Sequence, residues 1–523
     1  MTKQTFLKGA FILIIAGLIT RFLGFVNRIV VARIMGAEGV GLYMMAVPTL
    51  TLVITLTQLG LPVAISKLVA EAEATNDRQK IKKILVVSLA MTGILSIIFT
   101  IVMLAFAPVV ASTLLTDPRA YYPLMAIAPI VPIVALSSVM RGYFQGRQNM
   151  KPSAVSQVIE QVVRITLVAV MTTAFLPMGV EYAAAGAMAS VVIGELASLI
   201  YMIFMFKTNK RFRVRRGFFG YVKEGRKTFK ELMSIAIPTT GSRLIGSISF
   251  FFEPIVVTQS LAIAGVATVV ATSQYGELTG FAIPLLLLPT FITQSLSVSL
   301  VPAISEAAAR NHYQTVHYRL NQALRLALIS GGASVVILYV FAEPIMKLMY
   351  DAPTVATYIK LMAPFTIFLY FQGPLQATLQ ALNLAKAAMM NSLFGAVIKI
   401  GAIFALATRP ELGIMGAALA IVIGFVLVTM LHFASVAKTI SFTIDTKMVL
   451  KSVILIIATT WVGYLLASYA FTSYSLLMKT MITISITMIF YSALTIALGL
   501  VNSDELKRVP FIGKWLETLL PRS

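Results

Sequence analysis

Cysteine is absent from this 523-residue chain, and histidine, tryptophan and acidic residues are scarce. The lack of cysteine excludes disulfides and thiolate metal sites, and the three histidines (His312, His317 and His432) show no metal-binding spacing. The sequence also contains no nucleophile elbow, no phosphate-binding glycine loop and no loop carboxylates at glycosidase spacing. We therefore expect a protein that is not an enzyme and needs no bound cofactor.

Charge is scarce too, at 12% of residues, whereas 58% are hydrophobic and the mean hydropathy is +0.89. A soluble core cannot absorb that much apolar surface, so the composition predicts an all-α polytopic membrane protein. We predict about fourteen transmembrane helices. They fall near 7–33, 39–66, 84–110, 119–141, 153–177, 182–206, 231–256, 276–303, 321–346, 355–378, 387–408, 413–436, 449–470 and 475–500.

The distribution of the 42 Lys and Arg residues against 20 acids predicts the orientation. An even number of spans places both termini on one side, and most basic residues fall in loops on that side. By the positive-inside rule, we expect both termini to be cytoplasmic. The net charge of +22 is thus mainly a topology signal, and its spread over many short loops speaks against nucleic-acid binding.

Two halves of the chain resemble each other in order. Ser66 matches Ser305 at an offset of 239 residues, Arg164 matches Lys399 at 235, and Gly186 matches Gly416 at 230. Six spans per half give both halves the same orientation, so we expect lobes related by a pseudo-two-fold axis along the membrane normal. The predicted division is an N-lobe at 1–206, a basic linker at 207–230, a C-lobe at 231–436, and two additional helices with a tail at 437–523. The linker's cations either anchor topology or hold anionic lipid headgroups.

A doubled motif lies within this repeat. Arg21 and Gly24 recur as Arg243 and Gly246, and Arg28 lies on the same predicted helical face as Arg21. Each motif arginine lies about 18–21 Å from the inner end of its span at 1.5 Å per residue. A cation at that depth costs about 2.5–3.5 kcal/mol, so such residues are usually functional. Gly24 leaves room for a ligand to approach the backbone.

The fifth predicted span carries a polar face that includes Gln157, Glu160 and Arg164, and Lys399 occupies the matching span of the second half. Either these cations line a water-filled cavity between the lobes, or Glu160 and Arg164 form a self-neutralising pair that locks helices together. Glu195 is a candidate partner for one of the cations. Excess positive charge would favour an anionic ligand, because guanidinium groups bind phosphate oxygens bidentately.

Several segments resemble a known family. They are F-L-K-G near the N-terminus, T-R-F-L-G-F-V-N-R at 20–28, G-V-G-L-Y at 39–43, G-L-P-V-A-I-S-K at 60–67 and R-G-Y-F-Q-G at 141–146. The chain resembles the stage V sporulation protein B family over nearly its whole length. That family belongs to the multidrug/oligosaccharidyl-lipid/polysaccharide superfamily and is similar to the lipid II flippases.

The resemblance implies two six-helix lobes plus two helices, a V-shaped central cavity, a place in the bacterial cell membrane and a role in spore-cortex peptidoglycan synthesis. It implies a lipid-linked anionic oligosaccharide as substrate, with membrane lipids and cortex-synthesis enzymes as further partners. Arg21 matches the first arginine of the flippase motif in helix one, whereas Asn27 stands at the second, next to Arg28. A sodium ion or a proton could couple transport, and Asn391 is the nominated sodium ligand.

Three functions remain open on the sequence. The leading hypothesis is a peptidoglycan-precursor flippase that works by alternating access and binds the pyrophosphate headgroup with central cations. A cation-coupled multidrug exporter would need an unpaired intramembrane carboxylate, for which Glu195, Glu253 and Glu277 are available. The third is a membrane scaffold that recruits cortex-synthesis enzymes without transporting anything.

Overall fold

The structure is a computed structural model that describes residues 6–209 and 218–501. Every regular element in these two ranges is helical, as the sequence predicts for a polytopic membrane protein. Packing divides the chain into two units. Unit 1 contains the residues up to Gly280 together with Ala407–Ile414, and unit 2 contains Phe281–Leu406 and the residues from Met415 onward.

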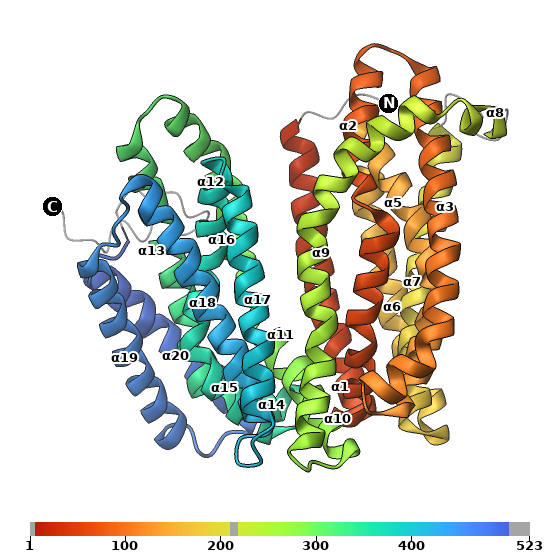
Figure 1. Ribbon diagram of the computed structural model, residues 1–523. Coiled ribbons are helices and arrows are strands. Elements are labelled where there is room, and N and C mark those ends of the chain that lie inside the picture. Colours follow the sequence, from red (N-terminus) through yellow and green to blue (C-terminus); the bar gives the residue numbers. More distant parts are fainter. Residues whose placement is uncertain (1–5, 210–217, 502–523) are drawn as a thin grey trace. The chain divides into compact units, whose positions relative to one another are not determined.

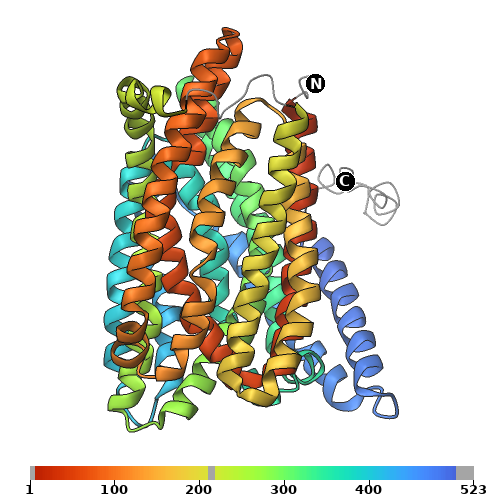
Figure 2. The ribbon, with the colours of Figure 1, turned by 90° about the vertical axis from the view of Figure 1, so that its right-hand side faces the viewer.

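The helices of unit 1 form a bundle in which α6 packs along α7 and α1 packs along α6, α9 and α10 (Figures 1 and 2). Their bounds are α1 Phe6–Gln58, α2 Leu61–Ala74, α3 Arg78–Val109, α4 Tyr121–Ile127, α5 Ile130–Gly146, α6 Lys151–Phe175, α7 Val180–Asn209, α8 Phe218–Lys223, α9 Arg226–Ile263 and α10 Thr268–Gly276. A π-helical turn at Val110–Leu114 and 3₁₀ turns at Pro118–Ala120 and Leu176–Met178 join some of them.

Unit 2 is a second bundle in which α12 packs on α16 and α13, and α19 packs on α13 and α20. Its helices are α11 Ile283–Leu287, α12 Thr290–Ala309, α13 Tyr313–Val340, α14 Ala342–Tyr350, α15 Ala356–Met362, α16 Thr366–Ala381, α17 Ala385–Ala407, α18 Ile414–Ile440, α19 Thr446–Tyr469 and α20 Leu476–Ala497. Short turns lie at Pro353–Val355 and Ala363–Phe365, and a π-helical turn at Glu277–Ala282 precedes α11.

The described helices account for all fourteen predicted spans. Twelve segments are long and apolar enough to cross a membrane, and a bent pair, Thr268–Leu287 with Thr290–Ala309, adds a thirteenth. The first segment, Ile15–Ala74, is 60 residues long and contains two predicted spans. Within it, Gly36 has φ 66° and ψ −174°, a left-handed φ that a glycine adopts without steric cost. The chain changes direction there.

The two units bury matching positions. In unit 1 a core cluster contains Leu61, Ile65 and Phe144. In unit 2 a cluster contains Leu300, Ile304 and Leu379, which lie at the repeat offsets of 239 and 235 residues from those positions. The internal repeat therefore specifies a similar buried core in each unit.

Packing and repeat divide the chain at different points. The repeat predicts a boundary in the linker at 207–230, whereas contacts group α9 and α10 with unit 1 and place the boundary after Gly280. A hydrogen bond of 2.8 Å between Thr55 Oγ1 of α1 and Ser247 Oγ of α9 is one such contact. The predicted lobes and their symmetry axis stay a prediction, and residues 210–217 of the predicted linker lie outside the described ranges.

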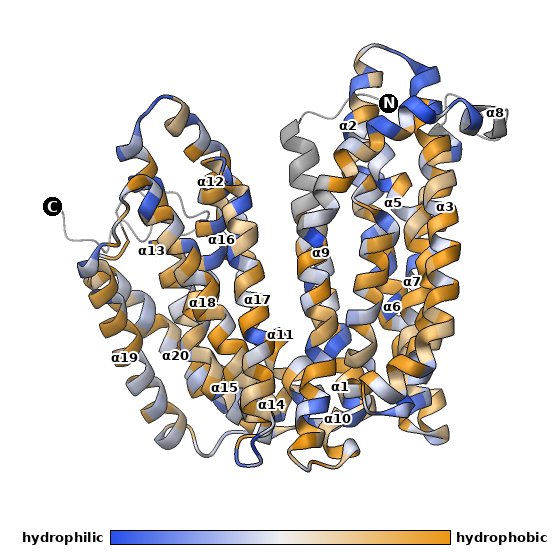
Figure 3. Ribbon diagram, in the orientation of Figure 1, coloured by the Kyte–Doolittle hydropathy of each residue, from blue (hydrophilic) through white to orange (hydrophobic). Residues whose placement is uncertain are grey.

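Hydrophilic residues lie at chain connections and along some helices of each unit. Figure 3 shows them at the α2–α3 connection in unit 1 and the α12–α13 connection in unit 2, and also along helices of both bundles. The sequence predicts both connections to be cytoplasmic. Large apolar side chains such as Ile101 of α3 and Ile457 of α19 are exposed along the helices between the two ends, as expected for surfaces that face lipid.

Candidate functional site

Four charged side chains form a cluster inside unit 1, which we call the four-charge cluster. It consists of Arg141 of α5, Glu160 and Arg164 of α6, and Glu195 of α7. Arg141 Nη2 donates hydrogen bonds to both carboxylate oxygens of Glu195, at 2.9 and 3.2 Å, and lies 3.6 Å from Glu160 Oε2. Arg164 forms an ion pair and a hydrogen bond with Glu160 one helical turn away. Two cations and two anions make the cluster neutral.

The local sequence explains how the cluster assembles. Glu160 and Arg164 have the i, i+4 spacing with the acid first, which is the favoured order on a helix. Gly194 of α7 allows α6 to approach closely, since a Cβ atom there would lie 2.9 Å from the Glu160 backbone oxygen. Glu195 follows Gly194 and is 4% exposed, so Arg141 compensates its charge where water cannot.

The sequence prediction for this cluster was incomplete. The Glu160–Arg164 pair was one of the two predicted alternatives, and Glu195 was a predicted partner for a cation. The cation that binds Glu195 is Arg141, which sequence reasoning used only as part of R-G-Y-F-Q-G. Little in the sequence signals this role, because Arg141 is the last residue of the predicted span 119–141 and long cationic side chains near helix ends usually reach the membrane interface.

The matching region of unit 2 has a cation, Lys399, at the position of Arg164, but no acid at the positions of Glu160 and Glu195. Lys399 of α17 lies beside Gly424 of α18, where a Cβ atom would be 3.2 Å from Lys399 Cγ. Arg164 and Gly194 show the same arrangement in unit 1, with 3.3 Å between a Cβ at Gly194 and Arg164 Cβ. The residues at the positions of Glu160 and Glu195 are uncharged. At the repeat offsets of 235 and 230 they are Gly395 and Phe425.

The arginines of the doubled motif have a different environment from the four-charge cluster. Arg21 and Arg28 of α1 and Arg243 of α9 are exposed, and within residues 6–209 and 218–501 none of them forms an ion pair. Both helices belong to unit 1. The three side chains are therefore available to an anionic ligand.

Polar groups beside these arginines lack protein partners. Asn27 is 7% exposed, and its Oδ1 atom has no hydrogen-bond partner among the described residues. The same holds for Gln161 Oε1 of α6, which lies 3.9 Å from the position of a Cβ at Gly24. Gln157 is half-buried one turn earlier on α6. The α1–α6 contact thus contains acceptors that a ligand or water could satisfy.

Asn391 of α17 is hydrogen-bonded to residues of α18. Its Nδ2 atom donates to the Leu431 carbonyl oxygen at 3.0 Å and to Ser435 Oγ at 2.9 Å, which ties α17 to α18. Its Nδ2 atom also lies 3.2 Å from His432 Nδ1. Within the part of the chain that the structure describes, no cluster of three His, Asp or Glu side chains has metal-binding geometry. Sodium binding at Asn391 stays a prediction.

A second ionic site in unit 1 consists of Arg119, Asp117 and Glu38, and Thr272 of α10 is hydrogen-bonded to it. Arg119 donates to Asp117 Oδ2 at 2.9 Å and is also paired with Glu38 near the end of the first span. Thr272 Oγ1 of α10 donates to Asp117 Oδ2 at 2.7 Å. Burial tends to raise the Asp117 pKa, but hydrogen bonds from Arg119 and Thr272 outweigh it and leave the pKa below its ordinary value.

Comparisons with known proteins identify the class. The family profile described as "Polysaccharide biosynthesis protein" matches residues 6–308, and the profile described as "MatE" matches residues 254–404. The fold is similar to a solved structure of the lipid II flippase MurJ in an inward closed conformation. The TM-score is 0.70 at 17% identity, covering 92% of this chain and 98% of that one. The chain is a multi-pass membrane protein of the flippase and transporter class, and is not an enzyme.

Curated relatives narrow the family. The chain is 60% identical over 514 residues to "Stage V sporulation protein B" of Bacillus subtilis, covering 98% of this chain and 99% of the relative. It is 24% identical over 414 residues to "Lipid II flippase MurJ" of the same organism, covering 75% of this chain and 76% of the relative. The chain belongs to the stage V sporulation protein B family, which confirms the resemblance predicted from the sequence motifs.

Proposed function

We propose that this protein moves a lipid-linked peptidoglycan precursor outward across the cell membrane during spore-cortex synthesis. Membership of the stage V sporulation protein B family and the match to a lipid II flippase support this substrate class. The observation that carries the proposal is the separation of two kinds of charge in unit 1. The four-charge cluster is neutral and internally paired, whereas Arg21, Arg28 and Arg243 are exposed without ion pairs to described residues.

The three arginines suit the chemistry of the substrate headgroup. Keeping Arg21 or Arg243 at its predicted mid-bilayer depth costs about 2.5–3.5 kcal/mol without compensation, so a function must offset that cost. A pyrophosphate linked to a polyprenyl lipid supplies several negatively charged oxygens, and each guanidinium can bind two of them. We infer that Arg21, Arg28 and Arg243 bind this group, with Lys399 as a further cation on the predicted translocation path. Alternating access would then expose the bound headgroup to each side in turn.

The four-charge cluster has a positioning role in this proposal. It ties α5, α6 and α7 together, and α6 in turn packs against the α1 segment that carries Arg21. Because its charges cancel, it adds little net attraction for an anion. Glu160, Arg164 and Gln157 would therefore hold α6 in place beside Arg21 and Arg28 and would not bind the substrate's phosphates directly.

The test is complementation of a sporulating strain that lacks its own copy of the protein and fails to make cortex. Arg21→Ala and Arg243→Ala should each abolish cortex formation at wild-type expression. Arg310→Ala is the matched control, because it removes an arginine whose side chain is 67% exposed in a surface pair with Glu306. Normal cortex in both test variants would contradict the proposed role of these cations.

A cation-coupled multidrug exporter is the second candidate, and the MatE match over 254–404 favours it. The structure weakens one of its requirements, since Glu195, the buried carboxylate nominated as ion carrier, is bound by Arg141. Exporter activity would appear as drug resistance on overexpression that Glu195→Gln abolishes. Resistance equal to that of an empty vector would remove this candidate.

A further inference from the structure

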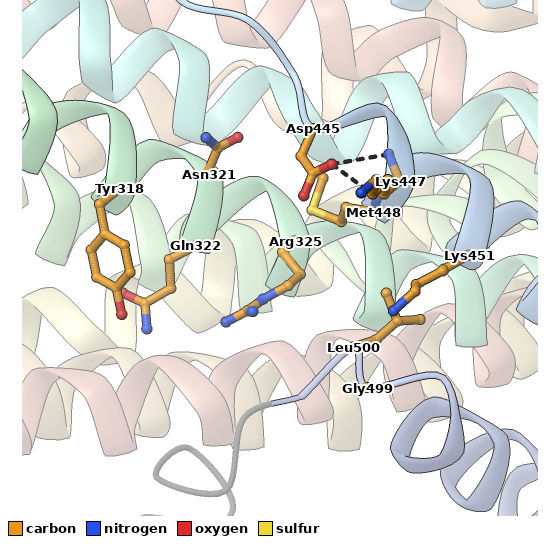
Figure 4. Close-up of a pocket in the computed structure, with 10 residues that line it drawn as sticks. All are labelled: Tyr318, Asn321, Gln322, Arg325, Asp445, Lys447, Met448, Lys451, Gly499 and Leu500. Atoms are coloured by element: carbon orange, nitrogen blue, oxygen red, sulfur yellow. Dashed lines mark hydrogen bonds between the residues drawn. The ribbon is translucent and has the colours of Figure 1, made fainter.

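The described residues that line a cavity at one end of unit 2 include three cations and one acid. Its volume is about 320 Å³, within the roughly 300–1,000 Å³ of small-molecule sites. Arg325 of α13 and Lys447 and Lys451 of α19 line it together with Asp445. Figure 4 shows Arg325 extending from α13 beside Gln322, and Lys451 extending from α19 toward Leu500. This cavity contains no residue of the four-charge cluster or of the doubled motif.

The acid is already engaged by the backbone. Asp445 Oδ1 accepts hydrogen bonds from the Lys447 backbone nitrogen at 2.9 Å and the Met448 backbone nitrogen at 3.4 Å, so it caps the N-terminus of α19 (Figure 4). Lys451 Nζ donates one hydrogen bond to the Leu498 carbonyl oxygen at 2.8 Å, and an ammonium has two more donors. Among the described residues that line the cavity, cations therefore outnumber acids by three to one, and Lys451 keeps spare donors.

The polar and apolar residues around the cavity indicate which class of ligand it could bind. Asn321 Oδ1 of α13 is buried without a hydrogen-bond partner among the described residues, so it can accept from a hydroxyl. On α19, exposed apolar side chains continue at helical spacing from Lys447 and Lys451. They are Ile454, Trp461 and Leu465, at 47, 65 and 37% exposure. The cationic cavity thus lies at the head of an apolar stripe that faces lipid.

We propose that this cavity binds the headgroup of an anionic glycerophospholipid, with the acyl chains along the α19 stripe. The phosphate would be held by Arg325, Lys447 and Lys451, and a glycerol hydroxyl would donate to Asn321. Basic pockets between helices on the cytoplasmic side of membranes bind lipids of this kind. The α12–α13 and α18–α19 connections beside the cavity are predicted to be cytoplasmic, which places it at the inner leaflet. The site does not depend on the transported substrate.

The test measures lipid binding by the full-length purified protein. Delipidated protein in neutral detergent is titrated with phosphatidylglycerol or phosphatidylcholine and followed by native mass spectrometry and by the melting temperature. The double variant Arg325→Gln with Lys451→Gln is compared with Lys386→Gln with Lys438→Gln. The control pair removes two exposed cations of unit 2 that do not line the cavity.

Each removed cation should weaken phosphatidylglycerol binding about fivefold, so the cavity double variant should lose roughly 25-fold. The control pair should bind as wild type does, and phosphatidylcholine should bind weakly to all three proteins. Equal phosphatidylglycerol binding by the cavity and control variants would overturn the proposal. If millimolar inorganic phosphate raises the melting temperature as much as phosphatidylglycerol does, the lipid assignment would be wrong and the cavity would be a site for free anions.

A single variant covers the case in which the double variant does not fold. Lys447→Gln removes an exposed side chain for which the structure shows no hydrogen bond to a described residue, so it should fold normally. It should still lose about fivefold in phosphatidylglycerol affinity, with Lys438→Gln as its control. Unchanged affinity in Lys447→Gln would contradict the site as described.

Discussion

The four-charge cluster allows a quantitative test by a double-mutant cycle on Arg141 and Glu195. Glu195→Gln leaves Arg141 in the protein interior with only Glu160, at 3.6 Å, as a counter-charge. Removing one partner of a buried ion pair typically costs about 3–5 kcal/mol. The side chain of Arg141 is 23% exposed and keeps that second partner, so we expect about 2–3 kcal/mol.

Removing the charge of Arg141 as well restores the charge balance of the cluster. Arg141→Gln in the Glu195→Gln background leaves only the Glu160–Arg164 pair, which is neutral by itself. The double variant should therefore lose less stability than the two single losses combined, with a coupling energy of about 2 kcal/mol. The measurement is reversible unfolding of the purified protein in mixed micelles with increasing sodium dodecyl sulfate.

A second cycle provides the control. Arg310 and Glu306 have the i, i+4 spacing at the surface, both about two-thirds exposed, and their N–O distance is 2.9 Å. Exposed pairs of this kind contribute about 0.2–1 kcal/mol, so their coupling energy should be small. Strictly additive losses for Arg141 and Glu195, with coupling no larger than in the control, would refute the view that this cluster is one electrostatic unit.

Two further predictions concern glycine packing and pH. Gly194→Ala should lower the melting temperature more than Gly424→Ala does, because a Cβ at Gly194 would meet the Glu160 backbone oxygen at 2.9 Å. The nearest atoms to a Cβ at Gly424 belong to the Lys399 side chain, the closest at 3.2 Å, so Gly424→Ala should mainly displace Lys399 and reduce transport. Equal melting temperatures for the two variants would contradict this packing argument. Asp117→Asn should lower the melting temperature at pH 7, and the gap to wild type should close as pH falls through the Asp117 pKa, which lies below 3.8. The sign follows because a depressed carboxyl pKa stabilises the folded state only above that pKa. A gap that persists to the lowest pH would show that Asp117 contributes through its shape and not its charge.

The sequence predicted the fold well because hydrophobic length is a strong local signal. Each predicted span needs only about 20 apolar residues, and that information is contained in the segment itself. The turn at Gly36 and the bend between Leu287 and Thr290 are harder to predict, since they merge or divide helices without a long polar loop. The repeat offsets also relate buried positions that the structure shows in the two units, such as Leu61 and Leu300.

The candidate site was predicted in part. Spacing along one helix identified Glu160 and Arg164 as a possible pair, because both residues lie on α6. Pairing between helices is not encoded in local spacing, so the Arg141–Glu195 bond was missed.

The central claim is that exposed arginines in unit 1 bind the headgroup of a lipid-linked peptidoglycan precursor for transport. The most direct measurement is translocation of fluorescent lipid II in liposomes reconstituted with wild type, Arg21→Ala or Arg310→Ala, with and without a sodium gradient. The account predicts translocation by wild type and Arg310→Ala at similar rates and a loss of at least tenfold in Arg21→Ala, as expected for about 1.4 kcal/mol or more of lost binding. Translocation by Arg21→Ala at the wild-type rate, or no translocation by any of the three proteins, would contradict it.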